Sequence, residues 1–133
     1  SYTDTGPFLA VQRAGVVALD RAEEFTAPIR DELARRRDAG VRALAAVGLP
    51  IESPKAAMYL WVPLPAGVPS APFTRFALET EGVVTLPGSG FGPAGEGYFR
   101  IALTVGQDRL ADAVGRLGRA LSAFQARSDN PGA

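Results

Sequence analysis

The stretch VVTLPGSGFGPAGEGYFRIALT, residues 83–104, predicts the centre of the fold. An apolar run, 83–86, is followed by eleven residues that include five glycines, and then by a second strand-like run, 98–103. The connection has no helical pattern, whereas parallel strands need a crossover of a dozen or more residues, usually a helix. The two runs are therefore expected to pair antiparallel in one small sheet.

The second run separates apolar from polar side chains, because successive residues of a strand point to opposite faces. Its large apolar positions share the face expected to pack on helices: Phe99, Ile101 and Leu103. Tyr98, Arg100 and Ala102 share the other face. The planar guanidinium of a lone strand arginine suits a carboxylate held by two hydrogen bonds. Arg100 is thus a candidate carboxylate-binding residue, and a surface arginine, or one paired with an internal Asp or Glu, fits the pattern equally well.

The glycine-rich connection also contains a match to the dinucleotide-binding pattern G-x-G-x-x-G, at residues 90–95. That pattern requires a helix N-terminus after it, so that backbone amides meet a phosphate. Here a strand follows, and Pro93 removes one amide. We therefore expect no dinucleotide site. A connection of this length is either functional or a slack surface loop, and the pattern leaves both open.

Apolar periodicity and helix breakers predict the remaining elements. A further strand is expected at 57–62, and the expected helices span residues 7–20, 21–49, 70–81 and 107–127. Expected N-caps are Asp4 or Thr5, Thr26 and Ser70, and expected helix ends lie at Gly48 and Gly82. The predicted fold class is α+β: a small, mainly antiparallel sheet with helices packed on one face, preceded by a long helix.

Composition excludes several kinds of site. The 133 residues contain no cysteine and no histidine, which removes disulfides, thiolate metal sites and Ser-His-Asp triads. No metal site is expected. The formal net charge is zero, so nothing favours nucleic acid or an anionic membrane. No apolar run reaches the ~18 residues of a membrane span, and no secretory signal opens the chain, so a cytoplasmic location is expected.

Four segments in order carry a family resemblance: FLAVQRAGVVAL (8–19), MYLWVPLP (58–65), EGVVTLPGSGFGPAGEGYFRIALT (81–104) and the closing amphipathic helix. Together they resemble the C-terminal portion of fold-type-I, class I and II pyridoxal-phosphate aminotransferases, near the aspartate, LL-diaminopimelate and N-succinyldiaminopimelate branches. The resemblance implies that Arg100 grips the α-carboxylate of an amino acid or 2-oxo acid substrate. It also implies a homodimer when the enzyme is intact.

The resemblance implies a domain organisation as well. Residues 1–20 would end the large cofactor domain, 21–49 would form a linking helix, 50–127 the small domain and 128–133 a frayed tail. The pyridoxal 5'-phosphate lysine and its neighbours would lie in a missing N-terminal large domain. The only lysine, Lys55, matches a turn before the 57–62 strand.

The chain alone is thus expected to hold no catalytic or cofactor-binding residue and to be inactive. Two other functions fit this half of the molecule: a stand-alone α+β binding or regulatory domain, or part of a related fold-type-I lyase. Tyr59, Trp61 and Tyr98 are interpreted as core or domain contacts rather than ligand contacts.

Overall fold

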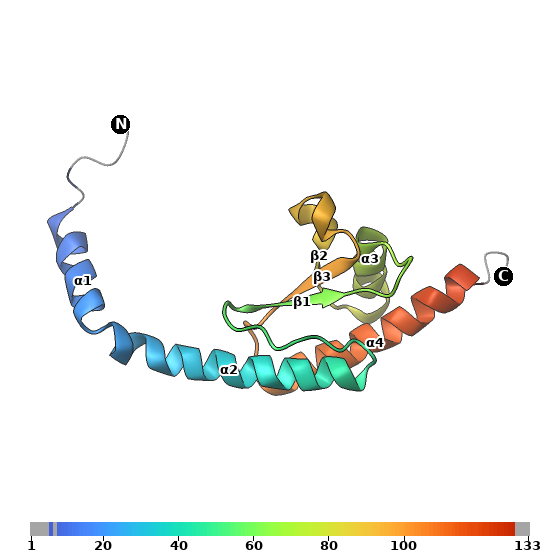
Figure 1. Ribbon diagram of the computed structural model, residues 1–133, viewed down its shortest axis with the longest axis horizontal. Helices are drawn as coiled ribbons and strands as arrows, with labels where there is room; N and C mark the ends of the chain where they lie inside the picture. Colours follow the sequence, from blue (N-terminus) through green and yellow to red (C-terminus); the bar gives the residue numbers. More distant parts are fainter. Residues whose placement is uncertain (1–5, 7, 130–133) are drawn as a thin grey trace. The chain divides into compact units, whose positions relative to one another are not determined.

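The computed structural model describes Gly6 and residues 8–129 and, for residues 128 and 129, the backbone alone. In chain order its elements are α1 (Leu9–Asp20), α2 (Ala22–Ala46), β1 (Tyr59–Pro63), α3 (Ser70–Glu81), β2 (Leu86–Pro87), two short 3-10 turns (Gly88–Phe91 and Pro93–Gly95), β3 (Tyr98–Ala102) and α4 (Gln107–Asp129), as Figure 1 shows. The chain divides into two compact units, Ser1–Glu32 and Leu33–Ala133, and the division falls inside α2. Among the described residues, no helix is both long and apolar enough to cross a membrane.

The first unit contains α1, which confirms the helix expected near the N-terminus. Phe8 occupies its N-cap position. The predicted capping residues, Asp4 and Thr5, lie outside the described residues. No residue of α1 is buried. Its large apolar side chains, and the one at its N-cap, are all at least half exposed: Phe8, Leu9, Val11, Val16, Val17 and Leu19.

The start of α2 corrects the prediction that Thr26 is its N-cap. The helix begins at Ala22, four residues earlier, and the Thr26 hydroxyl donates to the Ala22 carbonyl oxygen at 2.8 Å, as a threonine inside a helix does. Glu23 and Glu24 lie in the first turn, where negative charge complements the helix dipole. Two ion pairs hold this turn, one from Arg30 to Glu23 and one from Arg21 to Glu24. The helix therefore forms ahead of Pro28, which lies inside it.

The end of α2 agrees with the sequence. Gly48 has a positive φ of 79°, which glycine adopts without steric cost, and the Leu49 N–H donates to the Leu44 carbonyl oxygen at 2.9 Å. This 6→1 hydrogen bond is the Schellman arrangement that closes a helix C-terminus.

The sheet has three antiparallel strands in the order β1-β3-β2, so β3 lies in the middle. Trp61 of β1 and Leu86 of β2 are both register partners of Arg100. β1 begins two residues later than predicted, and β2 is reduced from 83–86 to Leu86–Pro87. The reduction has a local cause, because Gly82 ends α3 in the left-handed conformation and the Val83 N–H turns back to the Ala77 carbonyl oxygen. Val83 therefore belongs to the end of α3, and pairing starts only at Leu86.

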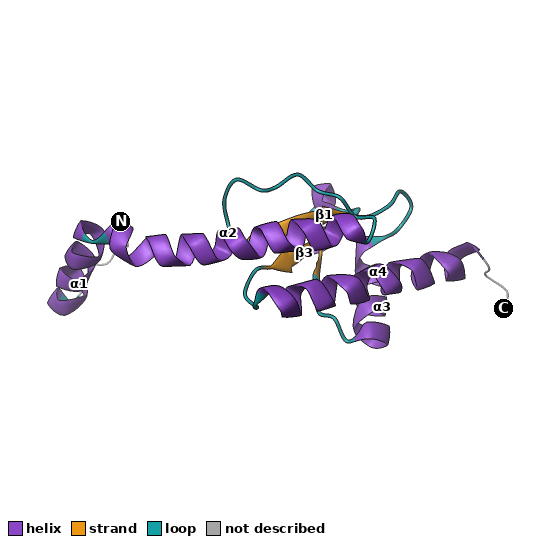
Figure 2. Ribbon diagram, turned by 90° about the horizontal axis from the view of Figure 1, so that it is seen from below, coloured by secondary structure: helices purple, strands orange, loops and turns teal. Residues whose placement is uncertain are grey.

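The predicted core face of the sheet is confirmed. The buried strand side chains are Leu60, Val62, Phe99 and Ile101, with Leu103 just beyond β3. Against them pack Phe73 and Ala77 of α3, Leu44 of α2, and the α4 stripe Leu110, Val114, Leu117 and Leu121. Figure 2 shows α4 running beside the C-terminal part of α2. A Cβ on Gly40 of α2 would lie 2.7 Å from a Leu60 methyl carbon, so this glycine permits the close packing of α2.

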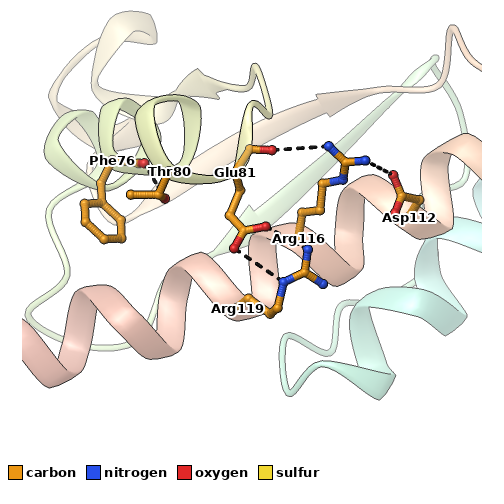
Figure 3. Close-up of polar contacts among 6 residues, drawn as sticks. All are labelled: Phe76, Thr80, Glu81, Asp112, Arg116 and Arg119. Atoms are coloured by element: carbon orange, nitrogen blue, oxygen red, sulfur yellow. Dashed lines mark hydrogen bonds and ion pairs between the residues drawn. The ribbon is translucent and has the colours of Figure 1, made fainter.

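Charged groups on the surface connect α3 to α4, as drawn in Figure 3. The Arg119 guanidinium donates to the Glu81 carboxylate at 2.7 Å. Arg116 pairs with Asp112 at 2.9 Å and donates to the Glu81 carbonyl oxygen at 3.4 Å. Exposed pairs of this kind contribute at most about 1 kcal/mol each, so burial of the α4 stripe dominates the packing.

The glycine-rich connection is a packed structure rather than a slack loop. Its two 3-10 turns bring Gly88 and Gly95 together so closely that a Cβ on either would overlap backbone atoms of the other. A Cβ on Gly88 would also lie 2.8 Å from the Tyr98 carbonyl oxygen. By contrast, a Cβ on Gly90 meets no atom within 4 Å.

Replacing Leu117 with aspartate is expected to lower the free energy of unfolding by about 3–5 kcal/mol, because an unpaired charge enters the core. Leu117 is 1% exposed. Denaturant unfolding measures the change, and Ala111→Asp, at an exposed position of the same helix, is the matched control. Equal stability of the two variants would show that the faces of α4 are assigned incorrectly.

Gly88→Ala is expected to lower the free energy of unfolding by about 1–3 kcal/mol or more, because the added methyl group overlaps backbone that has no room to move. Gly90→Ala adds the same methyl group two residues later, in open space, and should change it by less than about 0.5 kcal/mol. Thermal unfolding of both variants provides the comparison. A Gly90 variant as destabilised as the Gly88 variant would contradict the described loop.

Candidate functional site

Arg100 lies on the sheet face opposite the core, as strand alternation predicts. It is half-buried, between buried neighbours Phe99 and Ile101 on the same strand. Its guanidinium carbon lies 4.1 Å from the ring centre of Tyr59 and 4.5 Å from that of Phe91. Both distances fall within the roughly 6 Å at which a cation is attracted to an aromatic face.

Two further aromatic side chains extend this surface. The Trp61 ring stacks on Tyr98, with ring centres 5.7 Å apart, and meets Phe91 edge to face at 5.6 Å. We call Tyr59, Trp61, Phe91, Tyr98 and Arg100 the Arg100 cluster. It draws side chains from β1, β3 and the first 3-10 turn. The cluster is thus assembled by strand pairing together with the glycine-rich connection.

The guanidinium of Arg100 retains its hydrogen-bonding capacity. Within the part of the chain that the structure describes, it makes no hydrogen bond and no ion pair, and its contacts are the two rings. The alternative in which Arg100 pairs with an internal Asp or Glu is thus not observed among the described residues. Five N–H donors remain for an anion that comes from outside these residues.

A hydrogen-bonded latch holds the connection that carries Phe91. The Glu96 carboxylate accepts from the Ser70 backbone N–H at 2.7 Å and from the Ser70 hydroxyl at 2.9 Å. The Ser70 and Ser89 hydroxyls lie 3.0 Å apart, and the Ser89 N–H donates to the Ser70 oxygen at 3.3 Å. Ser70 is fully buried, so this contact fixes both turns to the start of α3.

The latch also corrects the prediction that Ser70 is the N-cap of α3. Pro69 occupies that position, and Ser70 is the first helical residue. Glu96, which is 26 residues away in the sequence, accepts the Ser70 N–H, one of the first amides of the helix, which have no partner inside it. The Ser70 backbone N–H, the Ser70 hydroxyl and the Gly97 backbone N–H, in that order, lower the pKa of Glu96. All three favour the ionised carboxylate.

The other candidate features of the sequence do not contribute to the Arg100 cluster. Lys55 is exposed in the segment before β1 and is not among the contacts of Arg100. The G-x-G-x-x-G match forms 3-10 turns followed by β3, not the start of a helix. No group of three His, Cys, Asp or Glu side chains suited to a metal ion occurs among the described residues.

The aromatic partners of Arg100 were missed by sequence reasoning. Tyr59 and Trp61 are 37% and 40% exposed, so of the two roles predicted for them, core or domain contact, they do not have the first. Phe91 gave the clearest available signal, because it is a large apolar side chain in a run of glycines. Its role requires the connection to fold back over β3, which no local pattern indicates.

The described residues do not fit a pyridoxal phosphate site. Such a site requires a lysine that forms a Schiff base and an acidic partner for the pyridinium nitrogen. The only lysine is the exposed Lys55, and within the described part of the chain no acidic side chain makes a hydrogen bond or ion pair with the Arg100 cluster. What the arrangement can do is bind and orient an anion at Arg100.

Glu96→Gln is expected to lower stability at pH 7 and to have a smaller effect in acid. A lowered pKa contributes stability that is present above the unfolded-state value, about 4.3, and is lost as the pH falls through the folded-state value. Denaturant unfolding of wild type and variant at pH 7, 5 and 3 measures the difference. Glu52→Gln, at an exposed position, is the matched control. A Glu96 effect that is absent at pH 7, or equally large at pH 3, would contradict the latch.

Comparisons with known proteins identify the family of the chain. The family model for aminotransferase class I and II matches residues 8–117. The chain is 46% identical over 121 residues to LL-diaminopimelate aminotransferase of Moorella thermoacetica, covering 91% of this chain and 31% of that protein. It is 50% identical over 115 residues to LL-diaminopimelate aminotransferase of Nitratidesulfovibrio vulgaris, covering 86% and 30%.

A solved structure gives the same result. The probable N-succinyldiaminopimelate aminotransferase from Thermus thermophilus superposes with a TM-score of 0.81 at 37% identity, over 89% of this chain and 32% of that one. The chain spans less than a third of the length of these proteins. Because the family model matches well over half of the residues, the chain belongs to the aminotransferase class I and II family.

Proposed function

We propose that this chain is the substrate-carboxylate-binding part of an aminotransferase and that Arg100 is the residue that binds the α-carboxylate. The observation that carries the proposal is the state of Arg100: half-buried on the open face of the sheet, held by two rings, with no hydrogen-bond acceptor among the described residues. A guanidinium in this state pairs well with a carboxylate, because the fork geometry allows two parallel charge-assisted hydrogen bonds.

The complete protein would move an amino group between an amino acid and a 2-oxo acid. The names of the relatives support this reaction, since each is an aminotransferase. Both kinds of substrate carry a carboxylate next to the reacting carbon, so one arginine serves the amino acid and the oxo acid alike. Its task is to bind the substrate and to set the direction in which the reacting carbon points.

Pyridoxal 5'-phosphate would supply the electron sink for this chemistry when it is bound. We infer that the residues that hold it belong to a large domain N-terminal to the residues described, since the chain spans less than a third of the length of its relatives. On this proposal, residues 1–20 end that domain, residues 21–49 link it to the small domain at 50–127, and the intact enzyme is a homodimer. The chain by itself would bind carboxylates at Arg100 without transferring an amino group.

The test is Arg100→Lys in the full-length protein that carries this chain. Lysine keeps the charge but loses the two-pronged geometry. A charge-assisted pair is worth about 1.5–3 kcal/mol, so kcat/KM for amino acid and 2-oxo acid should fall about 10- to 150-fold. The corresponding decarboxylated amine, which lacks the group that Arg100 binds, should be affected much less.

Arg109→Lys, the same change at an exposed position of α4, is the matched control and should leave both substrates unaffected. The proposal is wrong if Arg100→Lys uses amino acids almost as well as wild type does. It is also wrong if activity toward amines and amino acids falls equally.

A further inference from the structure

We propose that Tyr59 and Phe91 are positioning residues for Arg100: their rings hold the guanidinium ready for a carboxylate while leaving its N–H donors free. The proposal rests on the proposed function of Arg100. It adds how the guanidinium is held in place, with its N–H donors free, before the substrate binds. The observation behind it is the pair of ring contacts, at 4.1 Å from Tyr59 and 4.5 Å from Phe91.

The choice of ring partners has a chemical consequence. A carboxylate partner would hold an arginine equally well, and in this chain Arg30, Arg75 and Arg119 are each paired with a glutamate. Such a partner occupies the N–H donors and neutralises the charge, so an incoming carboxylate would have to displace it. A ring attracts the cation through its face and accepts no conventional hydrogen bond from it. Aromatic positioning therefore orients Arg100 without competing for its ligand.

The Phe91 ring is itself supported by other rings. The register partner of Arg100 is Trp61, and Tyr59 lies two residues before Trp61 on β1. Tyr59 is therefore the diagonal cross-strand neighbour of Arg100. Phe91 meets the edge of Trp61, and Trp61 stacks on Tyr98. Phe91, Trp61 and Tyr98 thus restrict one another's movement, and Tyr59 joins the cluster through the guanidinium of Arg100.

The backbone that carries Phe91 is fixed as well. Phe91 ends the first 3-10 turn, and Gly88 at the start of that turn packs directly on Gly95. The latch of Glu96 and Ser70 anchors the same connection to α3. The ring of Phe91 is consequently held over Arg100 by rigid structure rather than by a free loop.

A purely structural role accounts poorly for Phe91. Its side chain is 51% exposed and is not part of the buried core, so its removal sacrifices little buried area. Its recorded ring contacts are Trp61 and the guanidinium of Arg100. Removing the ring should therefore change the orientation and carboxylate binding of Arg100 more than it changes the free energy of unfolding.

The experiment compares Phe91→Leu and Tyr59→Leu with Phe91→Tyr, which keeps a ring. In the full-length protein, each leucine variant should raise KM for amino acid and 2-oxo acid about 3- to 10-fold, the range expected for a partly shielded cation–π contact. The decarboxylated amine should be unaffected, and Phe91→Tyr should restore the wild-type KM. Phe25→Leu is the matched control, because that ring is also exposed and also lies over an arginine, Arg21.

A second measurement reads the contact directly in the 133-residue chain. Ring currents should shift the Arg100 Nε–H proton upfield in its nuclear magnetic resonance spectrum, and each leucine variant should move it toward the value of an exposed arginine. This readout needs no cofactor and no turnover. Phe25→Leu should leave the Arg100 signal in place.

The outcomes separate this inference from the proposed function. If Arg100→Lys abolishes discrimination between amino acid and amine, but Phe91→Leu and Tyr59→Leu retain wild-type KM and signal position, Arg100 is the carboxylate-binding residue and the ring proposal is overturned. If Arg100→Lys retains discrimination, both fail. Equal losses for amines and amino acids in the leucine variants would also overturn the ring proposal, because they would indicate a general structural role.

Discussion

The antiparallel pairing of β3 with both of its neighbours is the constraint on which the rest of the structure depends. Because side chains alternate along a strand, one register places Phe99 and Ile101 in the core and Arg100 on the opposite face. A slip by one residue would bury the arginine and expose the apolar side chains. The burial of the α3 and α4 stripes thus fixes the position of Arg100 as firmly as it fixes the core.

The glycine-rich connection completes the surface around this strand position. Its two turns require glycine where backbone meets backbone, at Gly88 and Gly95, and its acidic residue, Glu96, fastens it to the first residue of α3. The polar side chains Ser89 and Glu96 of the connection thus hydrogen-bond to Ser70, while its aromatic side chain, Phe91, contacts Arg100. Scaffold and site share these residues, so the latch that stabilises the fold also maintains the geometry of the site.

Sequence patterns predicted the features that depend on local periodicity, namely the helices, the strand faces and the position of Arg100. They failed where a contact outside the periodic pattern decides the outcome. Glu96, 26 residues away in the sequence, accepts the Ser70 N–H at the start of α3. Nearer by, the Val83 N–H turns back to the Ala77 carbonyl oxygen and so shortens β2. The aromatic contacts of Arg100 join side chains separated by many residues, so only the folded chain brings them together.

The central claim is that Arg100 receives a substrate carboxylate while Tyr59 and Phe91 hold its guanidinium. The most direct measurement is a crystal structure of the full-length protein with a bound amino acid analogue. The account predicts two N–H···O contacts of about 2.7–2.9 Å between Arg100 and the α-carboxylate, with the guanidinium still over both rings. An α-carboxylate bound by a different residue, with Arg100 turned away from it, would contradict the account.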